Sequence, residues 1–183
     1  VTFLPPDRPR GYLRLYPQDF IVEEVLPDGA LVSLVDAVPF KDSEDRRTLW
    51  VDMVKASLAG PHAFRDLQAG LGLNETGVGY GGIKDALAVT SQRITLRGVT
   101  LEQLKAFQHD RMLLRPVAYG SGMLRPGELK GNRFTLTVRT DDKRDVAAHA
   151  DQVAQRGFVN FFGQQRFGGR LNSHLIGQKI LQG

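Results

Sequence analysis

The segment at residues 48–57, TLWVDMVKAS, has the pattern of a β-strand. Its apolar and polar residues alternate over most of its length, and a period of two is typical of a β-strand with one buried face. The run is short, so a helix stays open as the alternative. We expect a strand here.

The segment after Gly60-Pro61 predicts a helix. Its apolar residues fall at helical spacing, and they are Ala63, Phe64, Leu67 and Leu71. Proline is favoured in the first turn of a helix and glycine just past its end. We therefore expect a helix that starts near Pro61 and ends around residues 70–72.

Further strands and helices follow from the same two periods. Strand-like runs occur at residues 12–16, 20–25, 30–38, 90–99, 113–119 and 133–140, and helical runs at 101–108, 142–155 and 172–182. Thr100, with Gln103 three residues on, has the pattern of a capping box before the helix at 101–108. The predicted fold class is α+β, with a mixed, largely antiparallel sheet flanked by helices.

The composition excludes several classes of protein. The chain has 183 residues, of which 42% are hydrophobic and 24% charged, and these fractions exclude a disordered or collagen-like chain. The absence of cysteine excludes disulfides, thiolate metal sites and a cysteine nucleophile. It fits a reducing cytosol, although many secreted proteins also lack cysteine. No apolar stretch approaches the roughly 20 residues of a membrane span, so we expect no membrane partner.

Basic residues gather between residues 97 and 139. They are Arg97, Lys105, Arg111, Arg115, Arg125, Lys130, Arg133 and Arg139, opposed by Glu102, Asp110 and Glu128. The whole chain has a formal net charge of +4, which permits an anionic partner such as RNA without requiring one. Two interpretations stay open: a solvated basic face, and a surface that binds nucleic acid.

The most informative window is residues 79–90, GYGGIKDALAVT. Its glycines permit close approach of the backbone to a ligand or to another strand, and Lys84 and Asp85 follow them directly. A carboxylate in this place can serve as a nucleophile or a general base, held ionised by neighbouring cations. A glycine-rich turn with a solvated Lys–Asp pair is the alternative. The GxxxxGK[ST] spacing of a P-loop is absent.

Two later windows combine amides with aromatic side chains. In residues 129–138, LKGNRFTLTV, Asn132 and Phe134 are two positions apart and would project from the same strand face. An amide beside an aromatic ring suits a pocket that binds a nucleobase, and a core position for Phe134 is the alternative. Residues 160–168, NFFGQQRFG, add an arginine that suits phosphate contact, with a packed loop as the alternative.

Other chemistries lack the residues or the spacing that they require. The four histidines, His62, His109, His149 and His174, show no spacing typical of metal ligands. No GxSxG sequence is present, so a serine hydrolase of that kind has no support.

Taken together, four segments resemble the TruD family of tRNA pseudouridine synthases. Residues 17–24, PQDFIVEE, look like the family's P-x-D-F-x-V-x-E opening, and residues 82–85, GIKD, like its G-x-K-D motif. Residues 129–134, LKGNRF, look like L-K-G-N-x-F, and residues 160–168 like N-Y-F-G-x-Q-R-F-G. Each match alone is weak, but four in the family's order are specific.

This resemblance implies an enzyme that isomerises a uridine of tRNA, typically uridine-13, to pseudouridine without a cofactor or a metal, in the cytoplasm. Asp85 matches the family's catalytic aspartate, which attacks the target nucleoside. Arg14 falls where the family carries a basic residue able to pair with that aspartate. Phe134 matches the aromatic residue that stacks on the target base, and Asn132 is its neighbour in the pocket.

The resemblance further assigns Phe20, Glu24 and Lys84 to the same substrate-binding cleft, and it gives the basic stretch between residues 97 and 139 the task of gripping tRNA phosphates. It implies that residues 1–183 are the N-terminal portion of a pseudouridine synthase catalytic domain, without the family's inserted domain and returning segment. A non-catalytic RNA-binding module that retains the fold is the alternative, and a sugar- or nucleotide-binding protein unrelated to RNA is a third possibility.

Overall fold

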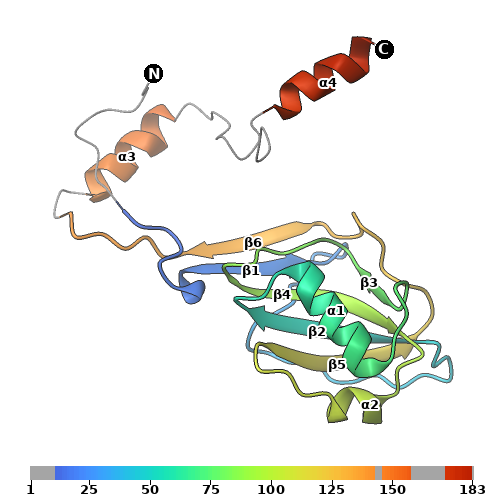
Figure 1. Ribbon diagram of the computed structural model, residues 1–183. Helices are drawn as coiled ribbons and strands as arrows, with labels where there is room; N and C mark the ends of the chain where they lie inside the picture. The colour runs from blue at the N-terminus through green and yellow to red at the C-terminus, as the bar shows by residue number, and fades with distance from the viewer. Residues whose placement is uncertain (1–10, 143–145, 158–171, 183) are drawn as a thin grey trace. The chain divides into compact units, whose positions relative to one another are not determined.

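The computed structural model describes residues 11–142, 146–157 and 172–182, which belong to two units (Figure 1). Residues 10–141 form the unit that contains the sheet. Residues 1–9 and 142–183 form the other, whose described part holds two helices, α3 (Val146–Arg156) and α4 (Ser173–Gln182). Among the residues that the structure describes, no helix is both long and apolar enough to cross a membrane.

One mixed sheet of six strands occupies the larger unit. The strands are β1 (Phe20–Val25), β2 (Thr48–Ala56), β3 (Val78–Tyr80), β4 (Val89–Arg97), β5 (Met112–Gly120) and β6 (Gly131–Leu136). Their order is β5-β2-β4-β1-β6, and β3 also pairs with β4. β1 and β4 run parallel, whereas the other pairings in the described sheet are antiparallel. The predicted α+β class is therefore confirmed.

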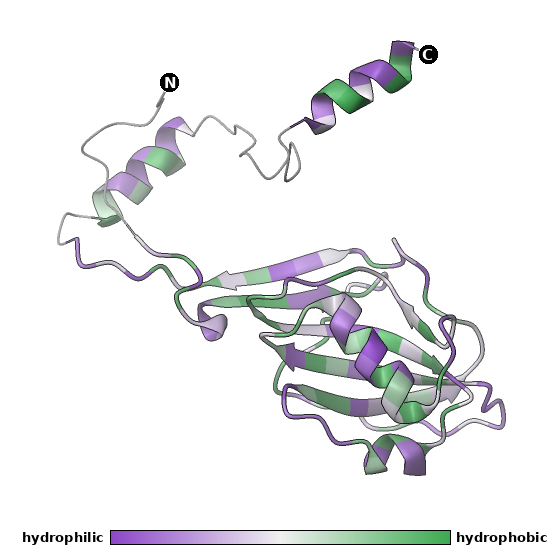
Figure 2. Cartoon of the chain, viewed as in Figure 1, coloured by the Kyte–Doolittle hydropathy of each residue, from purple (hydrophilic) through white to green (hydrophobic). Residues whose placement is uncertain are grey.

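The core forms on one face of β2, where the alternation of the sequence is reproduced. Leu49, Val51 and Met53 lie two residues apart and are each 0% exposed. They share one hydrophobic cluster with Leu67 of α1 (Gly60–Leu71), which lies across this face of the sheet (Figure 1). Figure 2 shows hydrophobic and hydrophilic residues alternating along the strands. The helical alternative for this segment is wrong.

Capping residues mark the C-terminal end of α1 and the N-terminal end of the second helix, α2 (Leu101–Ala106). α1 ends at Leu71 and is capped by Gly72, whose φ of 65° is in the left-handed region that favours glycine. α2 begins after Thr100, whose side chain accepts from the Gln103 N–H while the Gln103 side chain accepts from the Thr100 N–H. The predicted capping box is thus confirmed, although α2 ends at Ala106 rather than at residue 108, because Phe107 is already extended.

The predicted strand at residues 12–16 is wrong. This segment makes a single bridge, between Tyr12 and Arg139. Arg14 has a φ of 59°, a left-handed conformation that interrupts an extended strand. The large apolar side chains of the segment are about half exposed or more, so its alternation did not reflect a buried face.

The predicted strand at residues 30–38 is also wrong. It makes one bridge, between Leu31 and Val25. The guanidinium group of Arg115 donates hydrogen bonds to three carbonyl oxygens of this segment, those of Ser33, Leu34 and Asp36. A side chain therefore satisfies backbone groups that a neighbouring strand would otherwise pair.

Other boundaries differ less. β6 ends at Leu136 rather than at Thr140, although a bridge at Arg139 follows it. The helix expected at residues 142–155 corresponds to α3, and residues 143–145 lie outside the described residues. The helix expected at 172–182 is α4. The window at residues 160–168 also lies outside the described residues, so its predicted role stays a prediction.

Asp19 joins the segment before β1 to the segment after β6. Its buried carboxylate accepts two hydrogen bonds from the Arg139 guanidinium, both 2.8 Å, and one of 3.0 Å from the Tyr16 N–H. Its carbonyl oxygen accepts from the Thr137 N–H. The hydrogen bonds from Arg139, aided by that of Tyr16, hold the pKa of the Asp19 carboxyl below its ordinary value of 3.8.

A carboxyl group whose pKa is lowered in the folded state stabilises that state above its ordinary pKa, and the contribution is lost as the pH falls through the lowered value. We therefore expect Asp19→Asn to lower the urea midpoint at pH 7 and to lower it by less at pH 2. Urea denaturation at both pH values measures this. Asp110→Asn, at an exposed position, is the control, and an equal deficit at both pH values would contradict the interpretation.

Candidate active site

Asp85 lies in the loop of residues 81–88 that joins β3 to β4. β3 pairs with residues 94–96 of β4, and β1 pairs with residues 89–91 on the same edge of β4. The loop takes the chain from the end of β3 to the start of β4, where β1 is paired. The side chain of Asp85 is 37% exposed, and Nη2 of Arg14 lies 3.3 Å from its Oδ1. The structure thus brings together the two residues for which sequence resemblance implied a pair.

Two aromatic rings lie on the side of Arg14: Phe20 contacts Arg14, and Phe134 contacts Phe20. The Arg14 guanidinium lies over the Phe20 ring, 3.6 Å from its centroid. Phe20 in turn meets Phe134 edge to face, with centroids 6.0 Å apart. Phe20 is buried, whereas Phe134 is 53% exposed, so the outer ring keeps a free surface. The core alternative for Phe134 is therefore wrong.

The β1–β6 pairing places Asn132 on the same face. Asn132 lies opposite Glu24 and Phe134 lies opposite Val22, and residues directly opposite in a sheet project to the same side. Asn132 is exposed. The strand β6 thus presents an amide and an aromatic ring on one face, and Phe20 links the ring to the pair formed by Arg14 and Asp85.

Glu24 and Lys84 form a buried ion pair behind this surface. Their side chains are 1% and 3% exposed, and Nζ of Lys84 lies 2.5 Å from Oε2 of Glu24. Oε1 of Glu24 also accepts a hydrogen bond from the Arg93 N–H of β4. The two side chains face each other, and their expected contact with substrate stays a prediction. What the pair does in the structure is to fix the residue next to Asp85 to strands β1 and β4.

Sequence reasoning missed Lys55, the residue before the last of β2. Its buried Nζ donates hydrogen bonds to the carbonyl oxygens of Leu58 and Asp85. A signal was present in the sequence. Lys55 continues the alternation of Leu49, Val51 and Met53, so a charged residue occupies a position that the strand pattern assigns to the core.

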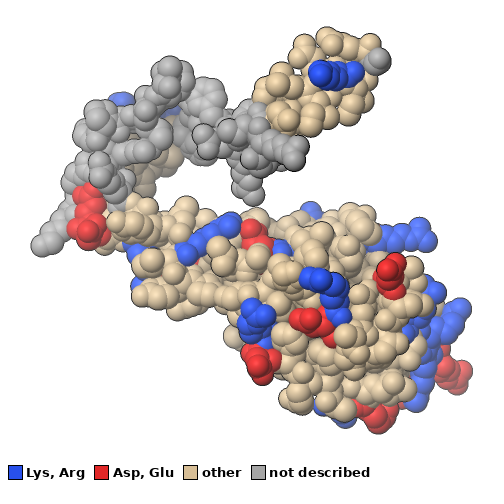
Figure 3. Space-filling view, viewed as in Figure 1, with Lys and Arg blue, Asp and Glu red and all other residues tan. Residues whose placement is uncertain are grey.

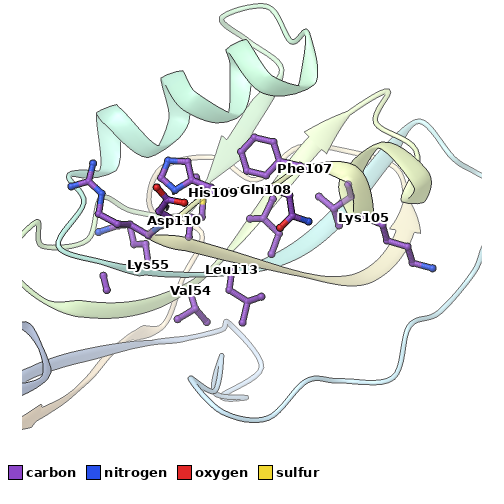
Figure 4. A pocket seen from close by; sticks show the side chains of 13 residues that line it. Val54, Lys55, Lys105, Phe107, Gln108, His109, Asp110 and Leu113 are labelled. Carbon is purple, nitrogen blue, oxygen red and sulfur yellow. Dashed lines mark hydrogen bonds between the residues drawn. The ribbon is translucent and has the colours of Figure 1, made fainter.

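A hollow of about 640 Å³ lies elsewhere, between β2, β5 and the loop that follows α2 (Figure 4). Its lining includes Lys55, Phe107 and His109 but none of the seven residues assigned to the site from sequence. Nε2 of His109 lies 3.1 Å from Oδ2 of Asp66 in α1. Among the described residues, no group of His, Asp or Glu side chains is arranged to hold a metal ion.

The comparisons with known proteins agree with the four motifs. The family model of tRNA pseudouridine synthase D (TruD) matches residues 7–183. The chain belongs to the TruD family. The resemblance inferred from the motifs is thereby confirmed.

Individual TruD relatives give the same result. "Probable tRNA pseudouridine synthase D 1" of Methanocaldococcus jannaschii is 31% identical over 94% of this chain and 45% of its own length. tRNA pseudouridine synthase D of Syntrophotalea carbinolica is 35% identical over 94% of this chain and 41% of its own. A crystal structure of a TruD protein from Methanosarcina mazei superimposes with a TM-score of 0.71 at 26% identity, covering 94% of this chain and 38% of that one. The chain spans less than half the length of these TruD relatives.

The contribution of the Glu24–Lys84 pair to the free energy of unfolding can be tested. Removing one partner of a buried pair leaves an uncompensated charge, which costs about 3–5 kcal/mol, whereas replacing both partners with apolar residues is often neutral. We expect Glu24→Met to lower the free energy of unfolding by about that amount and the double variant Glu24→Met/Lys84→Met to recover most of it. Urea denaturation measures both.

Glu75→Met, at an exposed position of the loop after α1, serves as the control. A single variant that unfolds at the wild-type urea concentration would show that the pair contributes little to the position of the Asp85 loop.

Proposed function

We propose that the full-length protein converts a uridine of tRNA, uridine-13 by resemblance to the family, to pseudouridine in the cytoplasm, with Asp85 as the nucleophile. The observation that carries the proposal is the partly exposed Asp85 carboxylate, paired with an Arg14 guanidinium that lies over the Phe20 ring, in a chain of the TruD family.

The chemistry suits a carboxylate held by one guanidinium group. The Arg14 guanidinium, 3.3 Å from Oδ1 of Asp85, fixes the direction of this carboxylate. Attack by the Asp85 carboxylate at C1′ forms a C1′–O bond as the N1–C1′ bond breaks. The base then rotates, and C5 forms its bond to C1′ as the C1′–O bond breaks and releases the Asp85 carboxylate. The proton lost from C5 is balanced by one gained at N1. Product and substrate are isomers, so the balance needs no oxidant, reductant or second substrate.

Phe134 and Asn132 supply groups that suit binding of the base. A uridine must leave its stack in a folded tRNA before a side chain can reach its glycosidic bond, at a cost of a few kcal/mol. The exposed ring of Phe134 offers a stacking surface that offsets part of this cost, and the Asn132 amide can hydrogen-bond to the edge of the base.

Release of tritium from tRNA labelled at C5 of uridine tests the nucleophile. We expect the wild-type full-length protein to release tritium and Asp85→Ala to lose at least about 10³-fold in rate, as for removal of other enzyme nucleophiles. Asp110→Asn should release tritium at the wild-type rate. Unchanged release by Asp85→Ala would refute the assignment, and tight tRNA binding by wild type without release would favour the RNA-binding module.

Some residues of the basic stretch between residues 97 and 139 bind other parts of the protein. Arg133 pairs with Glu23 and Arg139 with Asp19, while Arg111 and Arg115 donate to backbone carbonyl oxygens. Half of the eight basic residues are thus held by the protein itself.

Arg97 and Arg125 are arranged differently. With Arg47 they line a hollow of about 670 Å³ at the end of β4. Arg47 pairs with Asp45, whereas Arg97 and Arg125 form no ion pair within the described part of the chain. Figure 3 shows Lys and Arg side chains gathered at the end of the sheet where β4 and β5 finish. Arg97 stands eight residues beyond Val89 in β4, about 26 Å at the rise of an extended strand. We propose that this hollow binds tRNA phosphates at a distance from the reacting base.

The double variant Arg97→Gln/Arg125→Gln tests this phosphate contact. We expect a higher KM for tRNA with kcat nearly unchanged, because phosphate contacts position the substrate without taking part in the reaction. The slope of log affinity against log salt should fall by about 2, since each lost phosphate contact removes about 1.

Arg65→Gln, on the exposed side of α1, is the matched control for each single charge removed. A double variant that retains the wild-type salt dependence would show that these arginines do not contact the tRNA.

A further inference from the structure

Lys55 is an ammonium group buried without a carboxylate partner. It is 1% exposed, and the ion pairs formed among the described residues do not include it. Burial lowers its pKa to about 8, an effect that the nearby Asp85 opposes and Lys84 reinforces. Taking a charge out of water is costly, so an apolar residue continuing the row of Leu49, Val51 and Met53 would pack at lower cost.

The hydrogen bonds of Lys55 connect two parts of the chain. Nζ lies 2.7 Å from the Leu58 carbonyl oxygen, just beyond β2, and 2.8 Å from the Asp85 carbonyl oxygen. A hydrogen bond from a charged donor is stronger than one between neutral groups. Lys55 therefore ties the backbone of Asp85 itself to the end of a central strand.

Other groups hold the rest of the loop of residues 81–88. The Gln92 side chain donates to the Gly82 carbonyl oxygen at 3.0 Å, and the Ser57 N–H donates to the Ala88 carbonyl oxygen at 3.1 Å. The Glu24–Lys84 pair fixes the residue before Asp85. Arg14 contacts the carboxylate of Asp85, whereas Lys55 holds its main chain.

We propose that Lys55 is a positioning residue for Asp85, whose main-chain carbonyl it holds so that the carboxylate stays beside Arg14 and reaches the nucleoside. This inference rests on the proposed function for its kinetic consequence, but not for its structural one. A nucleophile displaced by about 1 Å can cost about 10²-fold in rate, so the expected effect lies in kcat rather than in tRNA binding.

The test compares Lys55→Met and Lys55→Gln in the full-length protein, both well below their unfolding midpoints. We expect Lys55→Met to lower kcat for tritium release about 10²-fold with KM for tRNA within about twofold of wild type, and Lys55→Gln, which keeps an N–H donor, to recover part of the loss. Lys41→Met, at an exposed position, is the control for removing a lysine. Wild-type kcat in a folded Lys55→Met variant would overturn the inference and leave the proposed function standing.

Hydrogen exchange of the amides in the loop of residues 81–88 supplies a readout that needs no activity. If Lys55 holds the loop, Lys55→Met should accelerate exchange at residues 85–88 more than in the other connections of the sheet. Unchanged protection there would overturn the inference even if the wild-type protein released no tritium. A wild-type protein that releases none, with faster loop exchange in Lys55→Met, would instead refute the proposed function alone.

Discussion

The position of Asp85 depends on the buried ion pair between Glu24 and Lys84. The loop that carries Asp85 has no regular secondary structure, so no ladder of backbone hydrogen bonds can place it. Glu24 is fixed by its place in β1 and by the Arg93 N–H of β4. Because Lys84 of the loop pairs with Glu24, the loop is held to the sheet at that residue. Lys55 and Gln92 extend the same arrangement from β2 and β4. A strongly held sheet thereby determines where an irregular segment puts its carboxylate.

Three strands meet at this point because β4 accepts two neighbours on one edge. β3 pairs with the far part of β4 and β1 with its beginning. The loop returns the chain from the end of β3 to the beginning of β4, and Gly81 in it lies so close to the main chain that an added Cβ would be 3.1 Å from the Glu128 carbonyl oxygen. β1 also pairs with β6, so Phe20 and Phe134 become neighbours although they are far apart in sequence. The site is therefore a product of the sheet's strand order.

Much of this could be predicted from the sequence, and the successes share a cause. The core face of β2, the ends of α1 and the capping box of α2 depend on residues that are close in the chain, and local spacing determines them. The pairing of Arg14 with Asp85 came instead from likeness to the TruD family, since no periodic pattern relates two loop residues so far apart.

The errors have a physical cause as well. Residues 12–16 and 30–38 alternate like strands, yet the backbone groups of the second are satisfied by Arg115, and the first is turned at Arg14. The role of Lys55 could not be predicted from pattern alone. Its two acceptors are main-chain oxygens, which every residue carries and which leave no mark in the sequence.

The left-handed backbone at Arg14 has a consequence for how the protein can change. At a φ of 59°, glycine is the residue that fits the main chain without steric cost, and a longer side chain costs about 1–2 kcal/mol there. The side chain that contacts Asp85 is thus carried by a residue that its own backbone disfavours. Selection for thermal stability alone would favour glycine at this position and remove the guanidinium, so backbone stability and the contact with Asp85 make opposite demands on a single residue.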